Sequence, residues 1–285
     1  MIIPDKNDFF KIKKLTDADF NRLSSLIYNE LGMKMPSQKK VLLEGRLHKR
    51  LRELNFHSFK EYIDFVLTEG EYNGELVTMF DLVTTNKTDF FRESKHFDFF
   101  SSTFLVDYYN KHPKQTLKIW SAGCSSGEEV YTLGMIIQEF KENNPNFDYQ
   151  IFGSDISMRM IHSASLAIYP DSRIGDIPYN LKKKYLLKNK DQSKRMIRIA
   201  PELREKTTFF RHNLMEENYN NLDMFDAIFC RNVLIYFDSN TQKQVIRKLT
   251  SNLKQGGYLF LGHSETVNNA TGDLLHIQPS VYLKK

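Results

Sequence analysis

Apolar residues recur at intervals of three and four over residues 15–77, the spacing of one face of an α-helix. Thr16 or Asp17 can cap a first helix, and Pro36 with Ser37 opens a second. The three apolar stripes are Phe20, Leu23, Leu26 and Ile27, then Leu43, Leu47, Leu51 and Leu54, then Phe59, Tyr62, Ile63 and Val66. We therefore expect a small helical domain over residues 11–78.

The pattern changes after Lys114, where short apolar runs alternate with loops and helical stretches. Strands are predicted at residues 117–120, 149–155, 225–230 and 258–262, with Gly256 and Gly257 forming the turn before the last. Helices are predicted after the loop that ends at Glu129 and over residues 244–253. This alternation predicts an α/β domain over residues 79–285, built on a mostly parallel sheet covered by helices.

The region at residues 171–206 interrupts this alternation because it is polar and basic. Its segment RMIRI, residues 195–199, alternates like a half-exposed strand. We expect a small antiparallel β subdomain inserted at about residues 171–206.

Composition narrows the class of protein. The 285 residues are 41% hydrophobic, and no apolar run approaches the ~20 residues that span a bilayer. The start, MIIPDK, lacks the charged-then-apolar pattern of a signal peptide, so we expect a cytoplasmic protein with no membrane insertion. Two cysteines without a CxxC pair and scattered histidines predict no metal. The net charge of +5 is compatible with nucleic acid, acidic protein or anionic lipid as a partner.

The most informative segment is WSAGCSSGEE at residues 120–129, a strand, a glycine-bearing turn and a helix start. Such a turn lies at the carboxyl end of a parallel sheet, and Gly123 lets a ligand approach the backbone. Asp155 ends the next strand and can accept hydrogen bonds from ribose hydroxyls. The pattern predicts a nucleoside site.

Two acids, Glu128 and Glu129, stand where a pyrophosphate needs amide donors and positive potential, and the turn is neither GxGxxG nor a P-loop. Carboxylates here suit a cationic ligand, so the charge pattern favours S-adenosylmethionine over NAD or ATP. The alternative is that they only stabilise the helix N-terminus, worth ~0.3–1 kcal/mol.

A hydrolase is the second interpretation of the same loop. Residues 123–127 read GCSSG, which matches the GxSxG nucleophile elbow, and Asp226 and His263 follow in the order of a Ser-Asp-His triad. This interpretation gives no role to Asp155 or to the acid pair, and no HGGG-type oxyanion segment precedes the loop.

Four segments in order resemble the CheR family, the chemotaxis receptor glutamate O-methyltransferases. They are TNKTDFFRE at residues 85–93, SAGCSSGEE at residues 121–129, CRNVLIYF at residues 230–237 and GYLFLGHSE at residues 257–265. The resemblance covers nearly the whole chain and implies a Rossmann-like class I methyltransferase sheet. The chain departs from the family pattern at Val130, where proline is usual, and at Ser126, where threonine is commoner.

The resemblance implies roles at the matching positions. Asn86, Thr88 and Arg92 line the methionyl end of S-adenosylmethionine, Glu128 meets its ammonium, and Asp155 holds its ribose. Asn213 and Leu214 contact the adenine, and Arg231 and Asn232 lie beside the sulfonium. Arg92 and Tyr236 flank the acceptor carboxylate as the catalytic pair. The products are a glutamate methyl ester and S-adenosylhomocysteine.

The resemblance also implies partners. The substrate is the cytoplasmic helical bundle of a chemotaxis receptor, and the basic second helix offers Arg46, Lys49, Arg50 and Arg52 to dock it. The alternative is that these side chains form a solvated helix face. In some family members a receptor C-terminal tail binds the inserted region, and residues 195–199 could receive such a peptide as an added strand. We expect a monomer.

Two other classes stay open from the sequence alone. A nucleic-acid methyltransferase fits the basic charge, but residues 231–234 read RNVL where amino-methylating enzymes commonly carry [D/N]PP[Y/F]. A non-catalytic cofactor sensor would keep the same fold.

Overall fold

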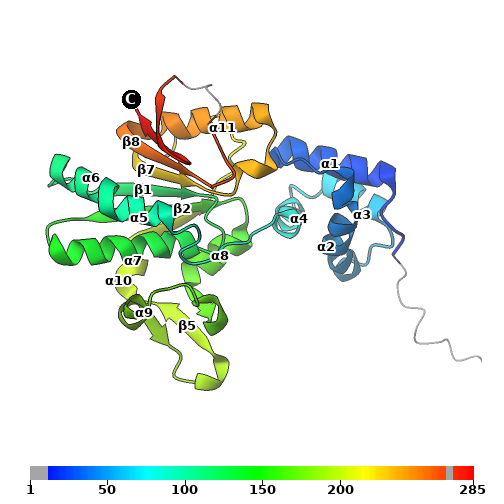
Figure 1. Cartoon of the computed structure of the whole chain (residues 1–285). Helices are drawn as coiled ribbons and strands as arrows, with labels where there is room; N and C mark the ends of the chain where they lie inside the picture. The colour runs from blue at the N-terminus through cyan, green and yellow to red at the C-terminus, as the bar shows by residue number, and fades with distance from the viewer. Residues whose placement is uncertain (1–11, 268–271) are drawn as a thin grey trace, which may run out of the picture. The chain divides into compact units, whose positions relative to one another are not determined.

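The computed structural model describes residues 12–267 and 272–285. Residues 1–11 therefore lie outside the described residues, including residue 11 of the expected helical domain and the N-terminal stretch compared with a signal peptide. The chain divides into two compact units, Met1–Thr85 and Asn86–Lys285 (Figure 1).

The first unit is helical, as the apolar stripes predict. Thr16 caps α1 by accepting a hydrogen bond from the Asp19 amide, and Gly32 ends that helix in the left-handed conformation, with φ of 66°. A 3₁₀ turn, Ser37–Lys39, precedes α2. The helices are α1 (Asp17–Leu31), α2 (Lys40–Glu53), α3 (Phe59–Thr68) and α4 (Glu75–Val83). The sequence did not distinguish α4 as a separate helix.

A buried carboxylate ties three of these helices together. Glu75 is 4% exposed and accepts hydrogen bonds from Arg50 of α2, through Nε at 3.0 Å, and from the Tyr62 hydroxyl of α3 at 2.8 Å. Because an unpaired buried charge is costly, Arg50 is needed to hold the unit together.

The second unit is built on a seven-stranded sheet in the order β6-β2-β1-β7-β8-β10-β9. The pairings run parallel from β6 to β8, whereas β10 is antiparallel to both β8 and β9. The strands are β1 (Leu117–Ala122), β2 (Tyr149–Asp155), β6 (Thr207–Arg211), β7 (Phe225–Cys230), β8 (Leu253–Leu261), β9 (Leu274–Gln278) and β10 (Val281–Lys284). The predicted mostly parallel sheet is confirmed.

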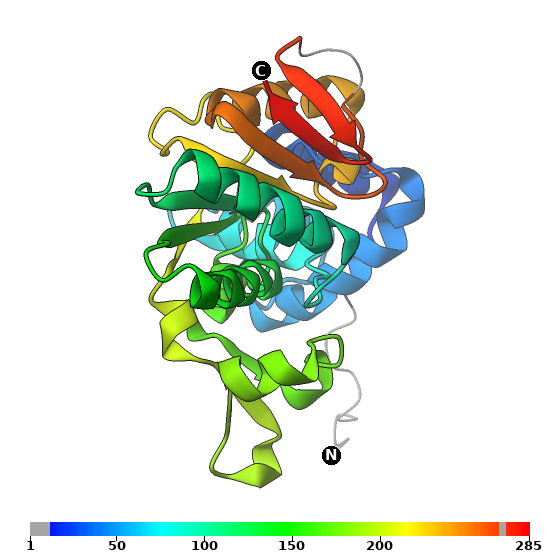
Figure 2. The same cartoon turned by 60° about the vertical axis from the view of Figure 1, so that its left-hand side comes forward.

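Helices cover the sheet on both faces, as Figure 2 shows for α6 and α11. On one face, aromatic side chains before and within α6 pack onto the central strands, where Phe229 and Phe260 stack with ring centroids 4.2 Å apart. The covering helices are α5 (Lys95–Phe99), a π-helical turn (Phe100–Phe104), α6 (Leu105–Lys111), α7 (Glu128–Asn143), α8 (Met158–Leu166) and α11 (Ser239–Ser251).

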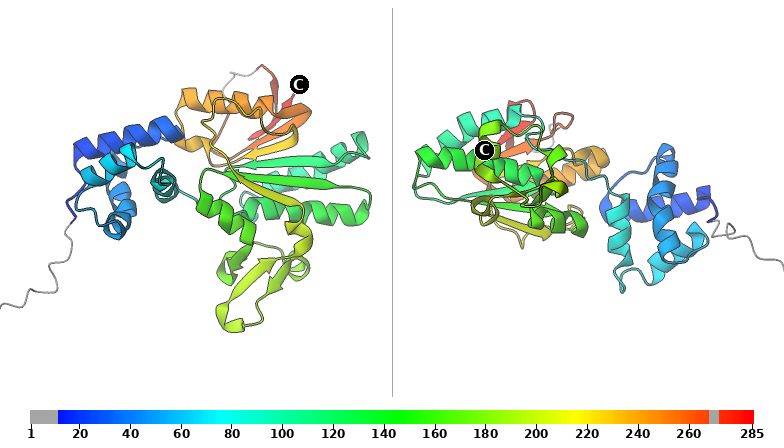
Figure 3. Two further views of the ribbon diagram at one scale, coloured as in Figure 1. Left: turned by 180° about the vertical axis from the view of Figure 1, so that it is seen from behind. Right: turned by 90° about the horizontal axis from the view of Figure 1, so that it is seen from below.

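The predicted insertion is a separate three-stranded antiparallel sheet in the order β3-β5-β4 (Figure 3). Its elements are β3 (Ile168–Pro170), a 3₁₀ turn (Asp171–Arg173), α9 (Tyr179–Tyr185), β4 (Leu186–Lys188), a 3₁₀ turn (Gln192–Lys194) and β5 (Met196–Ile199), and α10 (Pro201–Arg204) follows. Because β5 is the central strand, both of its sides are paired. The predicted peptide edge at residues 195–199 is therefore wrong, and the edges belong to β3 and β4.

One local prediction is also wrong. Gly256 and Gly257 do not form a turn before the strand; they lie inside β8, where the pairing jumps from Phe225–Leu253 to Ala227–Tyr258. Gly256 has φ of 74°, so the pair supplies a bulge instead. Among the described residues, no helix has both the length and the apolar character needed to cross a bilayer.

Candidate functional site

The candidate site lies at the carboxyl edge of the seven-stranded sheet. The chain leaves β1 towards β2 on one side, whereas β7 pairs with β1 on the other, so the strand order reverses here. Open α/β sheets bind ligands at such a point. Segments that follow β1, β2, β6, β7 and β8 all reach this edge and carry the predicted residues from Gly123 to Tyr236, whereas Asn86, Thr88 and Arg92 lie between α4 and α5.

The loop after β1 is shaped by three residues in the left-handed conformation: Gly123 with φ of 84°, Ser125 with 49° and Gly127 with 93°. A β-carbon on Gly123 would lie 2.5 Å from Val233, so a side chain there would clash with the segment after β7. Gly123 therefore allows the loop after β1 to turn and also to pack closely against the segment after β7.

Asp155 holds this loop in place. Its Oδ2 accepts the Ser125 amide and its Oδ1 accepts the Ser157 amide, both at 2.9 Å, and the residue is 7% exposed. Each carboxylate oxygen has a second lone pair. Asp155 can therefore order the loop and still accept ligand hydroxyls.

Glu128 begins α7 and is fully buried. Its Oε1 lies 2.7 Å from Arg173 Nη2, which comes from the 3₁₀ turn of the inserted subdomain, and its Oε2 accepts the Ser126 hydroxyl at 2.7 Å. Burial raises the pKa of Glu128 despite the opposing effects of Ser126 and Arg173. Arg173 also donates to the Thr88 carbonyl at 2.5 Å. The sequence did not point to Arg173.

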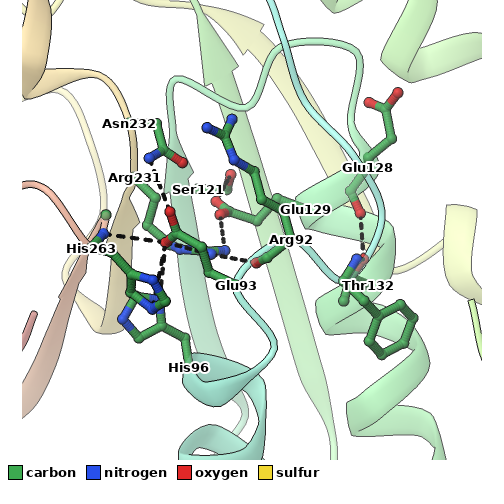
Figure 4. Close-up of polar contacts among 12 residues, drawn as sticks. Arg92, Glu93, His96, Ser121, Glu128, Glu129, Thr132, Arg231, Asn232 and His263 are labelled. Carbon is green, nitrogen blue, oxygen red and sulfur yellow. Dashed lines mark hydrogen bonds and ion pairs between the residues drawn. The ribbon is translucent and has the colours of Figure 1, made fainter. Parts of the chain in front are cut away.

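Arg231 is the centre of a buried charge network beside this loop (Figure 4). Its side chain is 3% exposed and pairs with Glu93 at 3.0 Å and with Glu129 at 2.9 Å. It also donates to the Arg92 carbonyl. Arg231, which is predicted to lie beside the sulfonium, is thus a cation paired with two carboxylates, and it fixes the segment that carries Arg92.

Glu93 is the second residue that sequence reasoning missed. Its carboxylate accepts from Arg231 and, at 3.1 Å, from the Asn232 side-chain amide. Burial opposes ionisation, but Asn232 and Arg231 outweigh it and hold the pKa of Glu93 below its ordinary value. Phe91 and Glu93 have φ of 54° and 58°, a strained backbone of the kind found at functional sites.

The two predicted catalytic residues lie on segments at this edge. Arg92 is half-buried, and its Nη1 donates to the Lys87 carbonyl at 3.0 Å. Tyr236 is half-buried at the end of a 3₁₀ turn (Leu234–Tyr236) after β7. Neither side chain is buried in the core.

The remaining predicted cofactor residues are placed mainly by backbone contacts. Asn86 accepts the Ser125 hydroxyl through its carbonyl at 2.9 Å. Asn213 follows β6 and caps its own turn by accepting the Met215 amide at 3.0 Å, and Leu214 beside it is buried. The His212 amide donates to the Asp155 carbonyl at 3.1 Å, which joins this segment to the end of β2.

Glu265, also missed, fixes the turn after β8. It is 5% exposed and accepts the backbone amides of Gly262 at 2.6 Å, Asn232 at 2.9 Å and Ile235 at 3.2 Å. Burial raises the pKa of Glu265 against these hydrogen bonds. The sequence feature that could have identified Glu265 is its place at the end of the family-like motif at residues 257–265.

The hydrolase triad is not assembled. The Ser125 hydroxyl donates to the Asn86 carbonyl. Asp226 lies near the opposite end of the sheet, where it accepts the Lys118 amide and the Lys254 ammonium, both at 2.8 Å. His263 lies beside Glu93 instead, with Nε2 4.0 Å from its carboxylate. The hydrolase interpretation is therefore wrong.

Of the predicted docking residues, two are held by partners on other segments of the first unit, and Lys49 forms an ion pair with Glu53 of its own helix at 3.7 Å. Arg46 donates to the carbonyl of Thr84 at 3.1 Å and to the Thr85 hydroxyl at 2.9 Å, and Arg50 binds Glu75. Lys49 is 83% exposed at its side chain, and Arg52 is also exposed.

The buried ring of His212 makes stability depend on pH. It packs against Trp120 and Tyr219, and burial lowers its pKa from the ordinary 6.5, against Glu216 and together with Lys248. The unfolded chain therefore binds more protons below about pH 6.5, so the free energy of unfolding falls as pH drops from about 7 to 5. We expect urea unfolding between pH 7 and 5 to show a smaller fall in the free energy of unfolding for His212→Gln than for the wild type. The exposed His162→Gln should show the same fall as the wild type. Equal falls in all three proteins would contradict the role of His212.

The fold and the site define a class I S-adenosylmethionine-dependent methyltransferase: a sheet with one reversed strand near its edge, a glycine loop after β1 and an acid ending β2. The family model "CheR methyltransferase, SAM binding domain" matches residues 86–283, and "CheR methyltransferase, all-alpha domain" matches residues 18–84. The chain belongs to the CheR methyltransferase family and is an enzyme.

Its relatives match over nearly their full length. A chemotaxis protein methyltransferase of Borreliella burgdorferi is 39% identical over 284 residues, which is 98% of this chain and 99% of that protein. One from Escherichia coli is 33% identical over 255 residues, 90% of this chain and 86% of that protein.

Proposed function

We propose that this enzyme methylates glutamate side chains of chemotaxis receptors in the cytoplasm, forming methyl esters from S-adenosylmethionine. One observation carries the proposal: the predicted cofactor loop and the segment that bears Arg92 lie side by side. Asp155 holds the loop, and Arg231 holds the Arg92 segment next to it. The family match and the printed names of the relatives support the receptor as substrate.

The residues present fit the cofactor. Asp155 offers hydrogen-bond acceptors for a ribose, Glu128 offers a buried carboxylate for an ammonium, and Gly123 keeps the loop close-packed. When bound, the cofactor supplies a methyl group activated by a positively charged sulfur. We assign Asn86, Thr88, Asn213, Leu214, Arg231 and Asn232 to the surrounding contacts.

The acceptor needs no general base. A glutamate with a pKa near ~4.3 is ionised at neutral pH, so its carboxylate is already a nucleophile. What this chain supplies is position: Arg92 steers the carboxylate and Tyr236 aligns it by hydrogen bonding. Excluding water from the carboxylate also helps, because hydration opposes attack.

The test is a transfer assay with tritiated cofactor and purified receptor cytoplasmic fragments. Label that base releases as methanol supports ester formation. Base-stable label would indicate amine methylation, and no label despite tight cofactor binding would indicate a sensor.

Arg173 provides a prediction about cofactor affinity. It occupies the Glu128 carboxylate that we assign to the cofactor ammonium, so the two cations compete. Arg173→Ala should bind S-adenosylmethionine about fivefold more tightly, since an ion pair of about 1 kcal/mol no longer has to be broken. Calorimetry at pH 8 measures this, with the exposed Lys190→Ala as control. Weaker binding by Arg173→Ala would show that Arg173 supports the site instead.

For the receptor we propose docking of its acidic helical bundle to the exposed basic side chains of α2. The double charge reversal of Lys49 and Arg52 to glutamate should slow receptor methylation about tenfold at low salt and less at high salt. Cofactor affinity should not change. The same reversal at the exposed Lys13 and Lys14 is the matched control; an equal loss there would contradict docking by α2. Arg46 and Arg50 are unsuitable because their loss disturbs the unit itself.

A receptor tail peptide is a further proposed partner. It would add to β3 or β4, the edges of the inserted sheet. We propose that the enzyme acts as a monomer.

A further inference from the structure

Three metal-ligating side chains converge beside the network of Arg231. Glu93 precedes α5, His96 lies in α5, and His263 follows β8. Glu93 Oε2 lies 3.6 Å from His96 Nδ1 and 4.0 Å from His263 Nε2. Ligand atoms of all three lie within 4.8 Å of one another. Figure 4 shows the two rings next to each other and next to the Glu93 carboxylate.

The ring of His96 lacks the partners that a buried imidazole normally has. The residue is 1% exposed, and neither ring nitrogen has a hydrogen bond of good geometry within the described structure, although Glu93 Oε2 lies 3.6 Å from Nδ1 and the Pro279 backbone is close to the ring. Buried polar atoms are rarely left in this state. A neutral imidazole has one ring nitrogen with a lone pair, which can bind a metal ion.

The surrounding charge also favours a cation. In the described structure, the single guanidinium of Arg231 faces two carboxylates, Glu93 and Glu129, at 3.0 and 2.9 Å. One negative charge is therefore left over. Glu93 Oε2 already accepts Arg231 Nη2 at 3.0 Å and the His263 amide at 3.3 Å, so an ion bound there would replace one of these hydrogen bonds.

We propose that Glu93, His96 and His263 form a binding site for a divalent transition-metal ion, with Zn²⁺ as the best fit. Two imidazoles and one carboxylate are a zinc donor set, and tetrahedral zinc places its ligand atoms about 3.3 Å apart. The ligand atoms, now within 4.8 Å of one another, would have to draw closer: the exposed His263 side chain can move towards Glu93 and His96, and Glu93 would have to close its 3.6 Å distance to His96.

The sequence predicted no metal because His263 is far from the other two ligands along the chain. A bound ion would tie the Arg92 segment to the turn after β8. It would also compete with Arg231 and Asn232 for Glu93, and so give the site sensitivity to metal.

Titration of the chelator-treated full chain with Co²⁺ tests the site. We expect one ion per chain, with visible absorption bands of a tetrahedral complex that Zn²⁺ abolishes and Mg²⁺ does not. His263→Ala, a change at an exposed side chain, should weaken binding at least about a hundredfold. His162→Ala, at an exposed histidine elsewhere, should leave it unchanged.

Binding also has a second readout, since a ligand that binds only the folded state raises the melting temperature. Zn²⁺ should raise it for the wild type and for His162→Ala but not for His263→Ala or Glu93→Gln. Absence of the bands in the wild type, or equal binding by folded His263→Ala, would overturn the proposal.

Discussion

Replacing Arg231 with methionine is expected to lower the free energy of unfolding by about 3–5 kcal/mol, because it leaves Glu93 and Glu129 with uncompensated charge in a buried place. The same change frees the Arg92 carbonyl, so methyl transfer should fall by more than about a hundredfold. Urea unfolding and single-turnover transfer measure the two effects.

Three further variants isolate the cause. Arg231→Lys keeps the charge but loses the planar fork, so its defect should be intermediate. Adding Glu129→Gln to Arg231→Met should recover part of the stability, since one unpaired charge is removed. Arg247→Met, on the exposed face of α11, should be close to neutral. If Arg231→Met were as stable as Arg247→Met, the network would not hold the site together.

The second large effect is expected for Asp155→Ala, which should weaken S-adenosylmethionine binding by about a hundredfold or more. Two hydrogen bonds donated by ribose hydroxyls to the Asp155 carboxylate are worth about 1.5–3 kcal/mol each. The variant also releases the amides of Ser125 and Ser157, which loosens the loop.

Calorimetry with Asp155→Asn separates the loss of ribose hydrogen bonds from the loosening of the loop. This variant retains one oxygen acceptor and the side-chain size, so it should lose less affinity than alanine. The exposed Asp176→Ala serves as control. An unchanged dissociation constant for Asp155→Ala would mean that the nucleoside lies elsewhere.

In the seven-stranded sheet, the buried central strands were predictable from their apolar runs, and the exposed strands at its two edges were not. All six residues of β7 are buried, so its apolar sequence identified it. The outermost strand β6 is only partly buried, and β9 is exposed over most of its length, so neither has a distinctive pattern. The bulge at Gly256 and Gly257 was predicted as a turn because a bulge and a turn both favour glycine, which has the backbone freedom they need.

For the site, the sequence located residues that follow strands, because parallel strands deliver their carboxyl ends to one edge. Gly123, Asp155, Asn213 and Asn232 are brought there in this way. It did not locate Arg173 or Glu93, whose roles come from partners distant along the chain. The pairing of Arg173 with Glu128, for example, joins an inserted subdomain to the start of α7 and has no periodic signal.

The most direct test of the central claim is to identify the methylated atom. Receptor cytoplasmic fragment is incubated with the enzyme and S-adenosylmethionine, digested at mildly acidic pH to preserve esters, and sequenced by tandem mass spectrometry. The account predicts a methyl group on glutamate side chains only, absent when the catalyst is Asp155→Ala. A methyl group on lysine or arginine, or no transfer by a chain that binds the cofactor, would contradict it.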